Sequence, residues 1–124
     1  MLKNDLILHH ASFVVANTEA SLAFYSGVLG LEQMERPDLG FAGAWLRLGE
    51  QQQLHLLELP NMDPTTGRPA HGGRDRHVAL STAALDPIRE NLDKKGVAYT
   101  LSISGRRALF CRDPDGNAVE ILER

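Results

Sequence analysis

Two strand-like segments decide the fold: HASFVV at residues 10–15 and HVALST at residues 77–82. Both begin with a histidine and are rich in β-branched and small apolar residues, the composition of a β-strand. A helix-forming segment follows each of them and ends at a glycine, Gly30 in the first case and Gly96 in the second. The chain therefore carries an internal repeat, which governs how each single residue is interpreted.

The repeat continues beyond each helix. The first copy predicts a strand at 6–15, a helix at 19–28, and strands at 31–36, 42–49 and 53–59. The second copy predicts a strand at 76–82, a helix at 88–95, and strands at 97–103, 107–111 and 118–122. The sequence thus predicts an α+β fold in one domain, residues 1–124, with module one at about 6–59, a linker at 60–75 and module two at about 76–122. The linker is rich in Pro, Gly and Asp, and is either a mobile flap over a site or a plain solvated connection.

Composition narrows the class of protein. The chain has 124 residues, of which 43% are hydrophobic and 23% charged, as in an ordinary globular domain. A net charge of −3 offers no basic excess for nucleic acid, and no apolar run is long enough to cross a membrane. Residues 1–8 lack the pattern of a secretion signal, and the single cysteine, Cys111, cannot form an internal disulfide. We therefore expect a cytoplasmic protein with no nucleic-acid or membrane partner.

The repeat places four metal-binding side chains at equivalent positions. Aligning the first strands pairs His10 with His77, and aligning the last strands pairs His55 with Glu120. The separations agree, at 45 residues from His10 to His55 and 43 from His77 to Glu120. Strand alternation puts each leading histidine on the face with small or polar neighbours, which suits a cavity wall, while the bulkier face packs on a helix.

These residue types favour one divalent metal ion, such as zinc, nickel, iron or manganese. His10, His77 and Glu120 would leave coordination positions open, and His55 is either a fourth ligand or a base. Each residue alone also fits a structural histidine or a surface glutamate, but four at repeat-equivalent positions argue against coincidence. Strand parity predicts that His9 lies outside the site.

Other residues have two interpretations each. Trp45 and Arg47 share a strand face and could line a cavity. Arg47, Arg74 and Arg107 could bind an anionic substrate through forked hydrogen bonds, or could simply be solvated. We take Trp45, Arg47 and Arg74 as candidate substrate-binding residues. His71, in the linker, is predicted to be a surface residue.

Several phrases together resemble the vicinal oxygen chelate superfamily, the glyoxalase, bleomycin-resistance and dioxygenase family. They are HASFVVAN at 10–17, SLAFY at 21–25, LGL at 29–31, LHLL at 54–57, HVAL at 77–80, and DPDGN at 113–117 leading to Glu120. The resemblance implies that two βαβββ modules form an open eight-stranded barrel, that positions His10, His77 and Glu120 hold a metal, and that the protein is a homodimer. It leaves open whether one chain or two build each site.

The resemblance further implies a glyoxalase-like lyase, isomerase or thiol transferase acting on a small substrate with vicinal oxygens, with His55 or Glu120 as the catalytic base. A histidine at position 55 departs from the glutamate of a typical glyoxalase I. The alternatives are a bleomycin-resistance-type binding protein without catalysis and a small extradiol-type dioxygenase, although the chain lacks the extra modules usual in extradiol dioxygenases.

Overall fold

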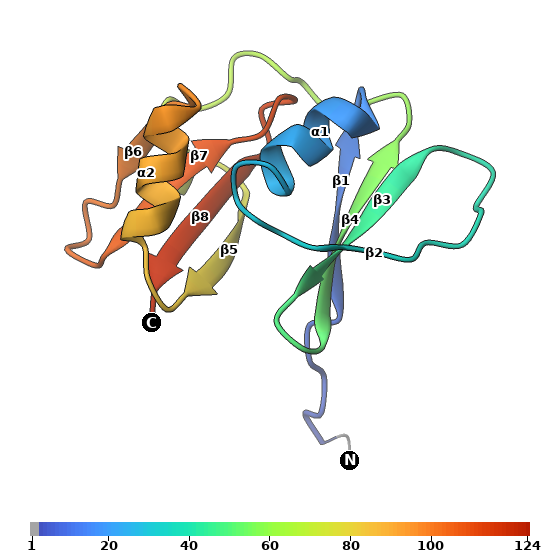
Figure 1. Ribbon diagram of the computed structural model, residues 1–124, viewed down its shortest axis with the longest axis horizontal. Helices are drawn as coiled ribbons and strands as arrows, with labels where there is room; N and C mark the ends of the chain where they lie inside the picture. Colours follow the sequence, from blue (N-terminus) through green and yellow to red (C-terminus); the bar gives the residue numbers. More distant parts are fainter. Residues whose placement is uncertain (1–2) are drawn as a thin grey trace.

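The computed structural model describes residues 3–124 and contains two βαβββ modules, shown in Figure 1. Module one consists of β1 (His10–Val15), α1 (Thr18–Tyr25), β2 (Gln33–Met34), β3 (Gly43–Leu48) and β4 (Gln52–Glu58). The linker holds a short 3-10 helix, η1 (Gly72–Arg74). Module two consists of β5 (His77–Thr82), α2 (Asp86–Lys94), β6 (Tyr99–Leu101), β7 (Ala108–Arg112) and β8 (Ala118–Glu123). The predicted α+β fold of two repeated modules is confirmed.

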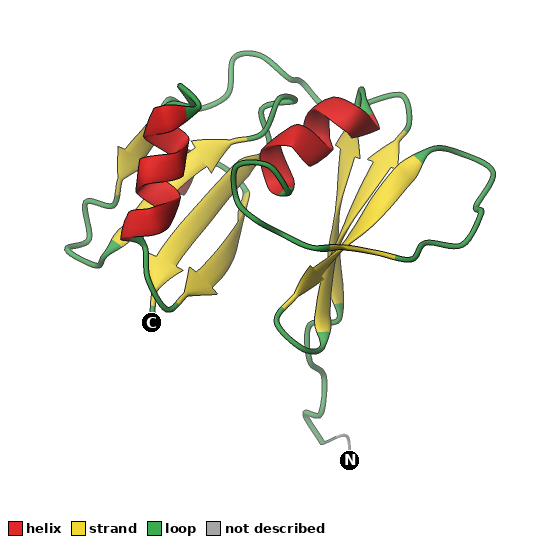
Figure 2. Cartoon of the chain, viewed as in Figure 1, coloured by secondary structure: helices red, strands yellow, loops and turns green. Residues whose placement is uncertain are grey.

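The two sheets have the same topology, as Figures 1 and 2 show. Their strand orders are β1-β4-β3-β2 and β5-β8-β7-β6, and in each the first strand pairs in parallel with the last. A parallel pair needs a crossover connection, and α1 or α2 begins that connection. Within residues 3–124 no strand pairing joins the two sheets, so the arrangement is open.

Three predicted strands are longer than the observed ones by four residues each. The first strand, predicted to begin at residue 6, begins at His10. Its partner β4 starts only at Gln52, so residues 6–8 have no strand to pair with. The strands predicted at 31–36 and 97–103 are observed only as the shorter β2 and β6, which lie at sheet edges and pair on one side only.

Within residues 3–124 no helix has the length and apolar composition needed to span a membrane.

The start of each helix is fixed by the last strand of its own module. Glu58, which ends β4, accepts a hydrogen bond from the backbone N–H of Thr18 at 2.8 Å. Glu123, which ends β8, accepts one from the backbone N–H of Leu85 at 2.9 Å. Both carboxylates meet free N–H groups at the positive end of a helix, where an anion is favoured. The repeat therefore extends to the hydrogen bonds that position the helices on their sheets.

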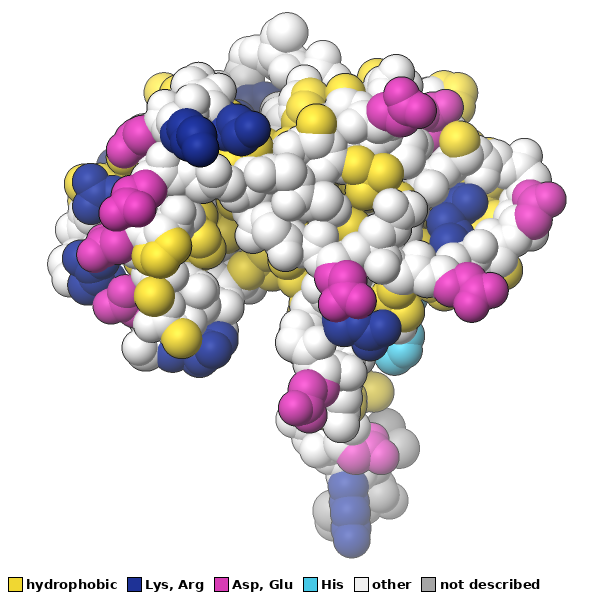
Figure 3. All heavy atoms as spheres, viewed as in Figure 1, with side chains coloured by type: hydrophobic (Ala, Val, Ile, Leu, Met, Phe, Trp, Pro, Cys, Tyr) yellow, Lys and Arg dark blue, Asp and Glu magenta, His cyan; other side chains and the backbone are white. Residues whose placement is uncertain are grey.

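A single hydrophobic core joins the two modules. Its fully buried members come from both sheets and both helices: Tyr25, Leu46, Leu54, Leu56, Leu92, Leu109 and Val119. On β4 and β8, successive side chains point to opposite faces, so one face of each sheet enters this core and the other faces away from it. In Figure 3, cationic and anionic side chains are interspersed over the visible surface outside the core.

A buried hydrogen bond ties module one to module two. The hydroxyl of Tyr25, at the end of α1, donates to Oδ2 of Asp113 in the turn before β8, at 2.7 Å. Asp113 also accepts from the backbone N–H groups of Asp115 and Asn117, both at 2.9 Å. Burial and the nearby Asp113 carboxylate raise the pKa of Tyr25 far above its usual value, so the phenol stays a donor.

We expect Tyr25→Phe to lower the free energy of unfolding by about 1–3 kcal/mol, because a buried carboxylate loses one of its donors. Urea denaturation followed by circular dichroism measures the change. Tyr99→Phe, at the half-buried edge strand β6, is the control and should change the unfolding free energy by less than about 0.5 kcal/mol. Equal effects of the two substitutions would show that the bond to Asp113 does not stabilise the junction.

Candidate metal centre

The open face of the first sheet, by which we mean the face that points away from the shared core, carries a stack of three rings. The imidazoles of His10 and His55 lie with their centroids 4.2 Å apart and their planes 18° apart. The indole of Trp45 covers the other side of His55, at 4.3 Å and 5°. The register of β1, β4 and β3 produces the stack, because it pairs Trp45 with His55 and places His10 two residues before Ser12, the β1 partner of His55, on the same face. We call His10 and His55 the histidine half-site.

Hydrogen bonds orient both imidazoles of this half-site. Nε2 of His55 lies 2.8 Å from Oε1 of Gln53, an acceptor, which assigns the ring proton to Nε2 and leaves the Nδ1 lone pair free. Burial, followed by the positive charges of His10, His9 and Arg36, lowers the pKa of His55 below its usual value. The neutral imidazole, which is the form that binds a metal, is therefore favoured near neutral pH.

His9 contributes to this half-site, contrary to the prediction from strand parity. Its Nδ1 lies 2.9 Å from Nδ1 of His10, and the two rings meet edge to face. Both residues are exposed, with His9 immediately before β1 and His10 its first residue; β4 pairs with their backbone but leaves the His9 side chain free to turn. Parity fixes the direction of a Cβ atom, but the rest of an exposed side chain can turn around the strand end.

The open face of the second sheet carries His77 and Glu120, which we call the carboxylate half-site. Nε2 of His77 lies 3.3 Å from Oε1 of Glu120. Nδ1 of His77 lies 2.8 Å from the backbone carbonyl oxygen of Asp75, so it donates its proton there and directs Nε2 toward the carboxylate. The ring of Phe110 packs against His77 at 90° with centroids 5.4 Å apart, and Glu120 is buried beneath it.

An arginine that the sequence did not single out completes the surroundings of Glu120. Nη2 of Arg106 lies 3.3 Å from Oε2 of Glu120. Arg106 belongs to the connection between β6 and β7, where the segment SGR at 104–106 has no hydrophobic period and gives no indication of which way a side chain points. Only its position relative to the folded strand reveals the contact.

The structure brings the four predicted ligands together as two pairs. His55 lies between Leu54 and Leu56 on β4, and both leucines point into the shared core, so His55 points away from it. Glu120 is placed in the same way between Val119 and Ile121 on β8. Among residues 3–124, no three side chains of His, Cys, Asp or Glu come close enough to hold a metal ion. Each pair alone therefore offers only two of the four donor side chains that the sequence predicts for one metal ion.

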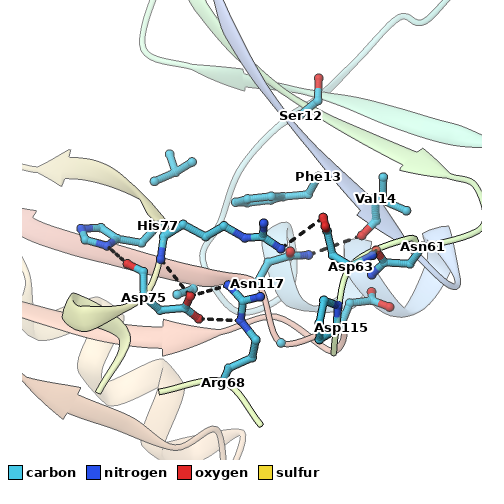
Figure 4. A pocket seen from close by; sticks show the side chains of 15 residues that line it. Ser12, Phe13, Val14, Asn61, Asp63, Arg68, Asp75, His77, Asp115 and Asn117 are labelled. Carbon is cyan, nitrogen blue, oxygen red and sulfur yellow. Dashed lines mark hydrogen bonds and ion pairs between the residues drawn. The ribbon is translucent and has the colours of Figure 1, made fainter. Parts of the chain in front are cut away.

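The linker lies over the junction of the modules and walls a cavity of about 350 Å³, shown in Figure 4. Ser12, Phe13 and Val14 of β1 line it, together with His77. The carboxylate of Asp75 binds Arg68 within the linker and Nη1 of Arg112 at 2.8 Å. Hydrogen bonds from Arg68 and Arg112 lower the pKa of Asp75 well below its usual range. The linker is thus tied to β7 by charge and is not merely a solvated connection.

The remaining predicted residues lie in different environments. Arg47 is exposed on the face that carries Trp45, whereas Arg74 is exposed on η1. Arg107 pairs with Asp86 and Glu123. Burial raises the pKa of the Cys111 thiol to about 12, so this thiol is protonated at neutral pH.

His71, which the sequence predicts to be a surface residue, is half-buried, and its hydrogen bonds are exposed. Its ring is partly buried and packs against Phe110 with centroids 5.0 Å apart, and its Nδ1 accepts a hydrogen bond from the backbone N–H of Gly73. His71 therefore lies next to the carboxylate half-site, but it is not one of the paired side chains.

Comparison with known proteins identifies the relatives of this chain. The profile described as "Glyoxalase/Bleomycin resistance protein/Dioxygenase superfamily" matches residues 7–121. The chain is 30% identical over 120 residues to "Glyoxylase I 4" of Arabidopsis thaliana, a match that covers 92% of this chain and 68% of that protein. It is 29% identical over 126 residues to a lactoylglutathione lyase of Neisseria meningitidis, covering 94% of this chain and 90% of that one.

Solved structures agree on the fold. A glyoxalase family protein from Bacillus anthracis superposes with a TM-score of 0.82 at 22% identity, covering 100% of this chain and 99% of the other. TnmS3, an antibiotic-binding protein from Streptomyces sp. CB03234, superposes with a TM-score of 0.74 at 21% identity, covering 98% of both chains. At these identities the likeness concerns the fold alone.

The ion pairs of Asp75 predict how firmly the linker is held. Asp75→Asn should speed cleavage of the linker by subtilisin, a protease of broad specificity, several-fold, because the amide binds Arg68 and Arg112 less strongly. Asp63→Asn is a matched control, since the pair between Asp63 and Arg76 is mostly exposed, at 59% and 62% of the two side chains. Mass spectrometry of timed digests gives the rates. The same rate for the two variants would show that Asp75 does not restrain the linker.

Proposed function

The chain belongs to the glyoxalase/bleomycin resistance protein/dioxygenase superfamily, and we propose that it is a divalent-metal-dependent, glyoxalase-like enzyme acting on a small substrate with two neighbouring oxygens. The observation that supports this most is the pairing of His10 with His55 and of His77 with Glu120 at repeat-equivalent positions. We further propose that the residue ranges of the two modules and a cytoplasmic location are as the sequence predicts.

The donor set fits the proposed metal. Three imidazoles and one carboxylate suit a borderline divalent ion such as zinc, nickel, iron or manganese. Nε2 of His77 already points toward Glu120, and Nδ1 of His55 has a free lone pair. When bound, the ion would act as a Lewis acid toward the substrate oxygens.

We propose that the two half-sites of one centre belong to two chains of a homodimer. Within one chain both pairs face away from the common core, so they can meet only if the histidine half-site of one chain faces the carboxylate half-site of another. A twofold axis would create two such centres at once, because a symmetric contact repeats every pairing.

The chain's own residues would bind the substrate and move its proton. Trp45 and Phe110 form apolar walls beside the two half-sites, which favours a substrate held away from bulk water. When it is not bound to the ion, His55, with its lowered pKa, is neutral and able to accept a proton at Nδ1, and Glu120 offers a carboxylate oxygen for the same task. The inert thiol of Cys111 fits a lyase, isomerase or thiol-transferase reaction that forms no covalent enzyme intermediate.

Two other functions have specific support. The aromatic surface around Trp45 suits stacking of a planar molecule, which favours sequestration of the kind named in the family's description. A pair of histidines with one glutamate is also a usual ligand set for non-haem iron, which favours a small extradiol-type dioxygenase. Both alternatives use the same faces of the two sheets.

Metal content tests the ligand assignment. His10→Ala, His77→Ala and Glu120→Ala should each lose most of the bound ion, because the remaining ligands hold it weakly. His55→Ala should lose activity more than metal if His55 is chiefly the base. His71→Ala is the control and should keep the wild-type stoichiometry. Elemental analysis of purified protein measures it, and full metal in both His10→Ala and Glu120→Ala would refute the assignment.

Mixing two metal-free variants tests whether two chains build each centre. One variant carries His10→Ala and His55→Ala, and the other carries His77→Ala and Glu120→Ala. Mixed dimers regain one intact centre out of two, so random reassociation should restore about one quarter of the wild-type metal. If one chain holds a whole centre, mixing restores none. Wild-type protein that stays monomeric by light scattering at micromolar concentration would also contradict the proposal.

Removal of the metal separates enzyme from binding protein. A panel of glutathione adducts, epoxides and catechols should include a compound that the metal-loaded protein turns over and that EDTA-treated protein does not. Readdition of the ion should restore turnover. The opposite pattern, no turnover of any compound but tight binding of a planar drug after EDTA, would favour sequestration.

A further inference from the structure

The buried carboxylate of Glu120 has two partners, and only one of them belongs to the proposed ligand set. Oε1 faces His77, whereas Oε2 faces Nη2 of Arg106 at 3.3 Å. The side chain of Glu120 is 5% exposed, and a carboxylate in such surroundings needs a charged partner. Arg106 therefore supplies the positive charge that this half-site requires when no metal is bound.

Arg106 is placed so that it can leave. Its side chain is 61% exposed, and besides Glu120 its Nε makes only a long contact of 3.4 Å with Oγ of Ser104. It belongs to an exposed connection between two strands, where reorientation of a long side chain costs little. Releasing Arg106 into water would break one ion pair and disturb no buried side chain other than Glu120.

The neighbouring arginine is held in a different way. Nη2 of Arg107 lies 2.7 Å from Asp86 and its Nε lies 3.0 Å from Glu123. Both residues lie in the connection just before β7, so the contrast comes from the acids within reach of each side chain and not from strand alternation. The two arginines have the same charge and adjacent positions but different carboxylate partners.

A divalent ion bound to Glu120 would lie within a few ångströms of the Arg106 guanidinium, and two positive charges at that distance repel each other. We propose that Arg106 is a displaceable counter-ion of Glu120: it stabilises the metal-free half-site, competes with the metal for the carboxylate, and so sets the metal affinity of the protein. This inference rests on the proposed metal centre. It assigns to Arg106, which is not one of the proposed ligands, the effect of lowering the affinity of that centre for the ion.

The proposal predicts opposite effects of one substitution on two quantities. Arg106→Gln should lower the Tm of the metal-free protein, because Glu120 loses its charged partner. The same substitution should tighten binding of zinc by about tenfold, because the ion no longer displaces a charge-assisted hydrogen bond. Damage to the structure alone would weaken zinc binding, so the direction of the change in affinity is diagnostic.

The experiment compares wild type with Arg106→Gln, Arg106→Lys and Arg107→Gln as full-length, metal-free protein. Zinc affinity is measured by competition with a fluorescent chelator, and Tm by calorimetry without metal. Arg106→Lys keeps the charge and should stay near the wild-type affinity. Arg107→Gln removes the same charge and lowers Tm, but its zinc affinity should remain within about twofold of wild type.

Two results would overturn the inference, and they differ in what else they affect. If wild type binds zinc and Arg106→Gln binds it no more tightly than Arg107→Gln does, Arg106 is not a competitor and the metal centre stands. If wild type binds none of zinc, nickel, iron and manganese, the metal centre falls and the inference falls with it.

Discussion

The structure depends on the burial of one face of each sheet in a single shared core. Leu54 and Leu56 on β4, and Val119 and Ile121 on β8, enter that core from the two modules. Because side chains alternate along a strand, every residue between them must point outward. The two candidate half-sites are therefore consequences of the same packing that folds the chain, and their separation within one chain is a consequence of it as well. Polar contacts such as the bond between Tyr25 and Asp113 fix the modules in the arrangement that this burial requires.

The repeat explains why so much of the site could be predicted. Each module pairs its first strand in parallel with its last, so the register that aligns Ser12 with His55 also aligns Ala79 with Glu120. A period of two then assigns each ligand to a face without any knowledge of tertiary structure. Strand length was less predictable. The lengths of β2 and β6 depend on how many residues pair with the neighbouring strand, and the sequence of the segment alone does not give that number. The division of the ligands into two pairs was not predictable either, since it depends on which faces the core covers.

The residues whose contacts could not be predicted from the sequence share one property. His9 lies immediately before β1, and Arg106, which the sequence does not single out, lies on a connection between strands. At such positions neither strand alternation nor a ladder constrains the side chain, so long or rotatable groups reach neighbours that their backbone position does not indicate. His71 belongs with them, because a short 3-10 helix carries it onto Phe110. Periodicity is thus informative in the regular elements and gives little information at their ends.

The difference between the half-sites shows why a cation is needed in only one module. The histidine half-site contains imidazoles that are stable when uncharged, and the lowered pKa of His55 fits that state. The carboxylate half-site places an acid in the position equivalent to His55, and burying that acid demands a compensating charge. Gly43 and Ala108 begin equivalent strands, so Arg106 corresponds to Phe41 in module one. Where the central ligand is a histidine the chain has an aromatic residue at this position, and where it is a glutamate the chain has an arginine directed at it. The module that has a glutamate in place of the histidine thus also has, in place of Phe41, an arginine that neutralises the glutamate.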